Sequence, residues 1–190
     1  MGNVKSIDVR IDSPGGSVTD ASTMYALLMD HSATINMRID GLAASAASYL
    51  AMAGDNISIN EAGFMMIHAA RAYGSGTATD FRKIADTLDM VTDTISNVYV
   101  ARTSQNKKTI DDWMRAETWF TGREAKENGF ADTLIENKTA GQKNRATARA
   151  KLYVEAFGAL PEALRPKAEN GGGRRDRTAL LNDARALMAR

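Results

Sequence analysis

The chain of 190 residues has no cysteine, only two histidines and only three prolines. The absence of cysteine excludes disulfide bonds and a cysteine nucleophile, and two histidines make a zinc site a poor expectation. We expect no signal peptide, and the sequence has no apolar run long enough to cross a membrane. We therefore expect a cytoplasmic protein with no membrane or nucleic-acid partner, no metal and no cofactor.

What the chain does contain is typical of a globular protein, with 44% hydrophobic and 25% charged residues. The charge is divided unevenly along it. Residues 1–136 carry 12 Lys and Arg against 18 Asp and Glu, whereas residues 137–190 carry 12 against 5. This contrast predicts a domain over 1–136 and a basic C-terminal extension over 137–190 that is partly helical or disordered.

Hydrophobic periodicity predicts an α/β fold in which strands and helices alternate. Because the chain opens as strand, helix, strand, helix, we expect parallel pairing with right-handed crossovers. Thr19 or Asp20 is expected to cap the first helix and Thr79 the longest one. The expected strands cover 6–11, 34–39, 57–59, 63–68, 117–120 and 130–135, and the expected helices cover 20–31, 49–53, 77–102, 109–114, 122–129, 145–158 and a last one from about 176.

A run of small residues, Gly41-Leu-Ala-Ala-Ser-Ala-Ala-Ser-Tyr-Leu50, lies where an expected strand passes into an expected helix. A hydroxyl on Ser45 would lie at the positive end of the helix dipole, beside free backbone N–H groups that can hold an oxyanion. Close helix packing is the alternative interpretation of such a run, and Ser48 is interpreted as packing.

Two further segments contain candidate site residues. In Asp12-Ser-Pro-Gly-Gly16 the two glycines permit positive φ and leave backbone N–H groups unshielded, although a plain turn has the same composition. His68 closes an apolar strand, where it is either a catalytic base or a structural residue.

Taken together, these motifs resemble the ClpP family of serine proteases. The resemblance rests on Asp12–Gly16, Gly41–Ser45 and Met66-Ile-His68, and on Glu124-Ala with Gly129-Phe-Ala-Asp132, and it covers about residues 4–136. The Glu-Thr-Trp-Phe element at 117–120 is similar to the phage-encoded branch, which acts in prohead and capsid maturation.

The resemblance implies a site. Ser45 would be the nucleophile, His68 the general base and Glu117 the third triad member, with Asp112 as the alternative. The backbone N–H groups of Gly16 and Ala46 would form the oxyanion hole.

Substrate binding is expected at Gly15 and at Gly74. The stretch 71–76, which contains Gly74, would pair with a polypeptide substrate as an added strand.

The resemblance also implies an architecture and partners. The fold would be a ClpP/crotonase-like spiral of β-α units, with helix 77–102 projecting as a handle for a homo-oligomer, a heptameric or tetradecameric ring. An ATP-driven unfoldase, or phage scaffold and portal proteins, would be partners, and the host cytoplasm or procapsid the location.

In one respect the chain departs from the family, whose members have several dozen residues before the Pro-Gly-Gly loop. Here eleven residues precede Asp12, so we expect either a late start or a fragment. The alternatives to an active ClpP-like endopeptidase are a degenerate subunit or scaffold protein, a signal-peptide-peptidase-like Ser–Lys hydrolase, and a crotonase-type acyl-CoA enzyme.

Overall fold

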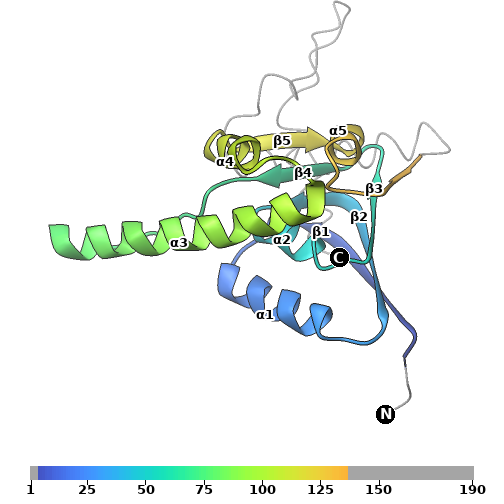
Figure 1. Ribbon diagram of the computed structural model, residues 1–190, viewed down its shortest axis with the longest axis horizontal. Helices are drawn as coiled ribbons and strands as arrows, with labels where there is room; N and C mark the ends of the chain where they lie inside the picture. Colours follow the sequence, from blue (N-terminus) through green and yellow to red (C-terminus); the bar gives the residue numbers. More distant parts are fainter. Residues whose placement is uncertain (1–3, 137–190) are drawn as a thin grey trace, which may run out of the picture. The chain divides into compact units, whose positions relative to one another are not determined.

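Six strands and five helices follow one another in residues 4–136, the part of the chain that the computed structural model describes (Figure 1). In chain order they are β1 (Ser6–Ser13), α1 (Val18–Met29), β2 (Thr34–Ala44), α2 (Ala46–Ala51), β3 (Asn56–Asn60), β4 (Phe64–Ile67), α3 (Ala78–Thr103), α4 (Lys107–Arg115), β5 (Thr118–Thr121), α5 (Gly122–Glu127) and β6 (Thr133–Ile135). Each element expected in this range is confirmed, although β2 continues through Ala44 and α2 begins earlier than expected. The helices expected at 145–158 and from 176 lie outside the described residues.

Strand β2 is the centre of a six-stranded sheet and makes three parallel pairings. Its first part lies between β1 and β3, and its last three residues pair with β4. Strand β6 pairs in parallel with β3, whereas β5 pairs with β4 in the antiparallel sense. The β1–β2 pairing confirms the expected parallel crossover, and the change of partner along β2 gives the sheet its curl (Figure 1).

The core lies against one face of this sheet. Alternate residues of β2, namely Ile35, Met37 and Ile39, are at most 2% exposed, as are Ile57 and Ile59 of β3. They pack with side chains from α1, α2 and α3. Each such burial stabilises the fold by about 1.5–3 kcal/mol, which is why the alternating pattern was readable in the sequence.

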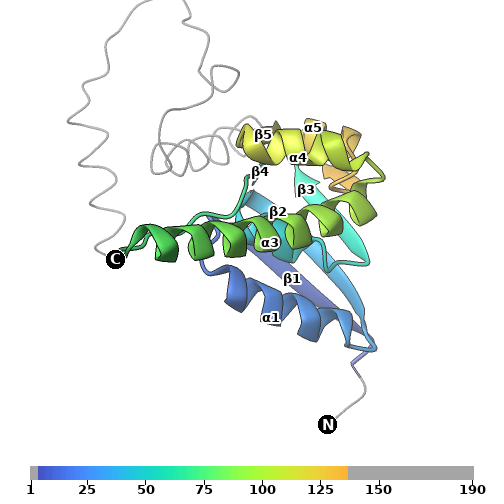
Figure 2. The ribbon, with the colours of Figure 1, turned by 60° about the vertical axis from the view of Figure 1, so that its left-hand side comes forward.

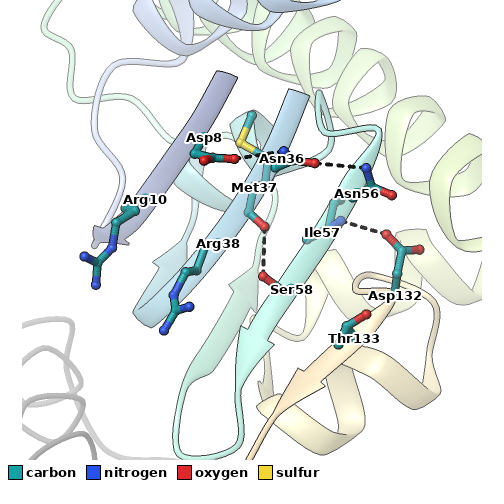
Figure 3. A pocket seen from close by; sticks show the side chains of 10 residues that line it. All are labelled: Asp8, Arg10, Asn36, Met37, Arg38, Asn56, Ile57, Ser58, Asp132 and Thr133. Carbon is teal, nitrogen blue, oxygen red and sulfur yellow. Dashed lines mark hydrogen bonds between the residues drawn. The ribbon is translucent and has the colours of Figure 1, made fainter. Parts of the chain in front are cut away.

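The other face of β1, β2 and β3 is polar (Figure 3). Arg10 of β1 and Arg38 of β2 both form ion pairs with Asp40, at 2.7 and 2.9 Å. Beside them Asn36 donates a 2.8 Å hydrogen bond to Asp8. This polar sheet face is hollowed into a cavity of about 580 Å³, which has no residue in common with the serine–histidine site described below.

Two of the expected helix caps were wrong by two or three residues. The side chain of Ser17 caps α1 by accepting from the Asp20 N–H, and Thr77 caps α3 in a reciprocal capping box with Asp80. A cap must precede the first helical residue so that its oxygen can reach the N–H three positions on. Thr19 and Thr79 are already inside their helices and cannot do this.

Helix α3 extends beyond the rest of the described fold in both ribbon views (Figures 1 and 2), which confirms the expected projecting handle. Its buried residues, Ile95, Ser96, Tyr99 and Thr103, all lie in its C-terminal half. Its N-terminal half instead exposes apolar side chains. No helix within residues 4–136 is both long and apolar enough to span a bilayer.

Candidate active site

Ser45 lies at a sharp reversal between β2 and α2, with φ +56° and ψ −127°. A positive φ is uncommon outside glycine and costs on the order of 1–3 kcal/mol, so other contacts must hold it. The Ser45 N–H donates to the Met66 carbonyl over 2.9 Å, and the Ser48 N–H donates to the Ser45 carbonyl over 3.0 Å. The flanking Ala44 and Ala46 are buried. The expected strand-to-helix position of Ser45 is therefore confirmed.

The pairing of β2 with β4 brings His68 to this turn. Ala44 lies opposite Met66 in a parallel register, so the residues that follow the two strands leave the sheet at the same edge. The Nε2 atom of His68 lies 2.7 Å from the Oγ atom of Ser45. That is hydrogen-bond distance, which a base needs to take a proton from a hydroxyl.

The Pro-Gly-Gly loop lies directly against the Ser45 turn. Gly15 has φ +96°, and a Cβ atom on it would lie 2.6 Å from the Ala44 carbonyl oxygen and 2.8 Å from the Ser45 Cβ. Only glycine allows this approach. The same construction on Gly16 meets nothing within 4 Å, so Gly16 borders open space.

A cavity of about 260 Å³ joins these parts. The described residues that line it are Pro14, Gly15, Gly16, Val18, Ser45, Ala46, His68, Ala70, Arg71, Ile95 and Tyr99. It brings together five of the predicted site residues: the serine, the histidine, both expected oxyanion donors and Gly15. No lysine is among the described residues that line this cavity, as a Ser–Lys dyad would need.

Glu117, expected as the third triad member, also lies near His68. It has φ +51° and forms a 3.1 Å ion pair with Arg71, whose side chain is 54% exposed. The alternative, Asp112, is on the surface of α4, where it pairs with Lys108 and Arg115. The described contacts thus place Glu117, rather than Asp112, in the electrostatic surroundings of the histidine.

The pKa of His68 lies below the ordinary histidine value. Partial burial is the largest cause, and the positive charge of Arg71 adds to it. The negative charge of Glu117 and a hydrogen bond with the backbone of Ala69 act in the opposite direction. Because burial and a nearby cation both disfavour the imidazolium, the ring stays neutral at neutral pH, which is the form a general base requires.

Two neutralising substitutions are expected to move the acidic limb of the kcat/KM profile in opposite directions. Arg71→Gln raises the pKa of His68, because protonation no longer meets a cation, and so moves the limb to higher pH. Glu117→Gln lowers that pKa and moves the limb to lower pH. The measurement is a pH–rate profile with a peptide ester, and Arg115→Gln is the matched control that should not move it. Shifts in the same direction would contradict the arrangement.

Other predicted residues lie elsewhere. Gly74 does not line the cavity, and a Cβ atom on it would lie 2.9 Å from the Cδ1 atom of Ile84 on α3. Its stretch, 71–76, is not a strand in the structure, so its substrate pairing stays a prediction. Within residues 4–136, no three His, Cys, Asp or Glu side chains gather as a metal site would need.

Sequence reasoning missed two residues of the site. Arg71 follows the strand end by four positions and had no motif to mark it. Tyr99, on α3, lines the cavity. Its hydrogen-bond partner, Ser48, is 51 positions away in the sequence. The place of Tyr99 on the buried side of a helical pattern was the one available signal, and that signal indicates core packing equally well.

The fold and the site together define the class: a curled, mainly parallel α/β protein with a serine–histidine pair where neighbouring strands end. The family model described as Clp protease matches residues 1–138, which is more than half of the chain. The chain therefore belongs to the Clp protease family.

Curated relatives agree with this placement. The chain is 32% identical over 137 residues to the ATP-dependent Clp protease proteolytic subunit 1 of Streptomyces avermitilis and equally so to subunit 3 of Streptomyces coelicolor. Each alignment covers 69% of this chain and 61% of the relative. The proteolytic subunit of Pinus contorta is 27% identical over 136 residues, covering 70% and 66%. The chain thus spans less than two thirds of the length of these relatives.

Proposed function

We propose that the chain hydrolyses peptide bonds as a serine endopeptidase, with Ser45 as nucleophile and His68 as general base. The observation that carries the proposal is the 2.7 Å hydrogen bond between Ser45 Oγ and His68 Nε2. A serine hydroxyl is a weak nucleophile until a neighbouring base can take its proton. With Nε2 facing the serine, the neutral ring holds its own proton on Nδ1.

The reaction follows from this geometry. Ser45 Oγ attacks the peptide carbonyl carbon while His68 Nε2 takes the hydroxyl proton, and the resulting oxyanion is held by the N–H groups of Gly16 and Ala46. The C–N bond then breaks, and His68 gives its proton to the leaving amine. Water, deprotonated by the same imidazole, hydrolyses the acyl-enzyme and restores the serine. These steps use no nucleotide.

We assign Glu117 the role of third triad member. Its charge favours the imidazolium that forms in the transition state, since it raises the pKa of His68. Its carboxylate forms an ion pair with Arg71, and its negative charge acts on the His68 ring through space.

The proposed enzyme works as a homo-oligomeric ring. Support comes from α3, whose projecting half exposes Phe81 at 50% and Met90 at 64%, apolar surface that a second copy would cover. Light scattering is expected to give a heptamer or tetradecamer of the 20.5 kDa chain. A monomer at micromolar concentration would contradict the ring.

The substrate class is polypeptide, taken from an unfoldase partner or from a phage scaffold or portal protein. For the phage setting, in which the enzyme would act in capsid maturation, the support is the Glu117–Phe120 element.

The test of the hydrolase proposal is covalent labelling of the full chain with a fluorophosphonate. We expect one phosphonyl group per chain, found by mass spectrometry on the peptide that contains Ser45, and no labelling after heat denaturation. Absence of labelling in a folded oligomer would overturn the proposal and favour a degenerate subunit. An adduct on other serines would overturn it as well.

A further inference from the structure

A fully buried hydroxyl lies directly beneath the Ser45 turn. The Oγ atom of Ser48, at 0% exposure, is 2.6 Å from the Ser45 carbonyl oxygen and 2.9 Å from that of Met66. It is also 2.8 Å from the hydroxyl of Tyr99 on α3. The Met66 carbonyl accepts from the Ser45 N–H too, so one small cluster ties the turn, the end of β4 and α3 together.

The direction of hydrogen-bond donation in this cluster follows from the groups it contains. Carbonyl oxygens accept and never donate, and Ser48 has a single proton, which it gives to the carbonyl of Ser45 or of Met66. The contact between the two hydroxyls then requires Tyr99 to be the donor. Burial raises the pKa of Tyr99 far above its ordinary value, so the phenol keeps its proton throughout the working pH range.

We propose that Ser48 and Tyr99 are positioning residues, which hold the Ser45 hydroxyl in line with His68. This inference rests on the proposed hydrolase function. Neither side chain touches the reacting atoms through its hydroxyl; each acts through the backbone of the turn. Ser48 donates its one proton to the carbonyl of the nucleophile itself or to the carbonyl two residues before the base.

The strain at the turn explains why such a restraint is needed. Ser45 has the φ of +56° that a non-glycine residue avoids, and it stays there only where the surroundings over-determine it. Helix α2 begins at the next residue and has six residues, so it is too short to hold the turn by itself. The hydroxyl of Ser48 adds a restraint on the strained residue, and Tyr99 fixes that hydroxyl from a long, separate helix.

The substitutions Tyr99→Phe and Ser48→Ala test this on the full chain with a peptide ester. We expect kcat to fall about 10-fold for Tyr99→Phe and about 100-fold for Ser48→Ala, with KM changed less than about twofold, because misalignment affects the chemical step more than binding. If the two act in series, the double variant is no slower than Ser48→Ala alone.

Ser96→Ala is the matched control, since Ser96 is equally buried, at 0%, but bonds Asp111 away from the turn. A purely structural role for Ser48 predicts that both alanine variants lower the melting temperature and that neither changes kcat, which would overturn the inference. If Ser48→Ala fails to fold, Tyr99→Phe still tests the inference, because it removes only the hydroxyl and keeps the aromatic side chain in the core.

A second readout separates this inference from the proposed function. The Nε2 resonance of His68 in ¹⁵N NMR reports its hydrogen bond to Ser45 without any turnover. We expect it to move in Tyr99→Phe and to stay in Ser96→Ala. Wild-type chain that neither hydrolyses nor labels would overturn the function alone, whereas an unmoved resonance in Tyr99→Phe would overturn the positioning role.

Discussion

Ser45→Ala is expected to lower kcat for peptide hydrolysis by about 10⁵- to 10⁶-fold, the loss typical when a serine hydrolase loses its nucleophile. Without Oγ there is no acyl-enzyme, and the oxyanion donors and binding contacts leave a small residual rate. The measurement is single-turnover hydrolysis of a fluorogenic peptide. Ser58→Ala is the matched control, because Ser58 lies on the polar sheet face and donates to the Met37 carbonyl. A Ser45→Ala chain with a tenth of wild-type activity would contradict the assignment.

A companion change at the same position separates activity from stability. Ser45→Gly is expected to remove activity to the same extent while raising the free energy of unfolding by about 1 kcal/mol, since glycine adopts positive φ without strain. Denaturant unfolding measures the second effect. If Ser45→Gly were less stable than Ser45→Ala, the positive φ at position 45 would not be a source of strain for a residue with a Cβ atom.

His68→Ala is expected to lower kcat by a similar factor and to slow fluorophosphonate labelling of Ser45 by several orders of magnitude. The serine remains in place but keeps its proton, because the base 2.7 Å away is gone. The double variant Ser45→Ala with His68→Ala is expected to lower kcat little more than either single variant does, since the two side chains act as one unit.

The chain supplies its own control for the histidine. His31 is its other histidine, and the Nδ1 atom accepts from the Ala33 N–H at the end of α1. His31→Ala is expected to leave kcat and labelling unchanged. Equal losses in the two histidine variants would indicate a general effect on folding and would contradict the role given to His68.

Much of the architecture could be predicted from local pattern. The alternation in 34–39 and the apolar run before His68 are set by burial on a sheet, so they are visible in a single sequence. The parallel pairing of β2 with β4 is what brings Ser45 and His68 together. Their positions just beyond strand ends made these two residues candidates, and the resemblance to the ClpP family implied their roles.

The rest of the site depends on contacts that have no period in the sequence. The Arg71–Glu117 ion pair and the Ser48–Tyr99 hydrogen bond each join residues far apart in the chain. The first depends on the antiparallel pairing of β4 with β5, and the second on where α3 packs against α2. The prediction of Thr79 as the cap of α3 was wrong for a different reason. Thr77 and Asp80 have capping-box spacing, but Thr79 offered a competing hydroxyl, and only the helix start decides between them.

The central claim is that His68 acts as the base for Ser45, and two titrations of the wild-type chain test it most directly. One follows the His68 imidazole by ¹⁵N NMR, with His31→Gln to assign the signals. The other follows the rate of fluorophosphonate labelling of Ser45 against pH. The account predicts that both have the same midpoint, below the ordinary histidine value of 6.5. A labelling rate that stays constant across the pH range in which His68 titrates would contradict it.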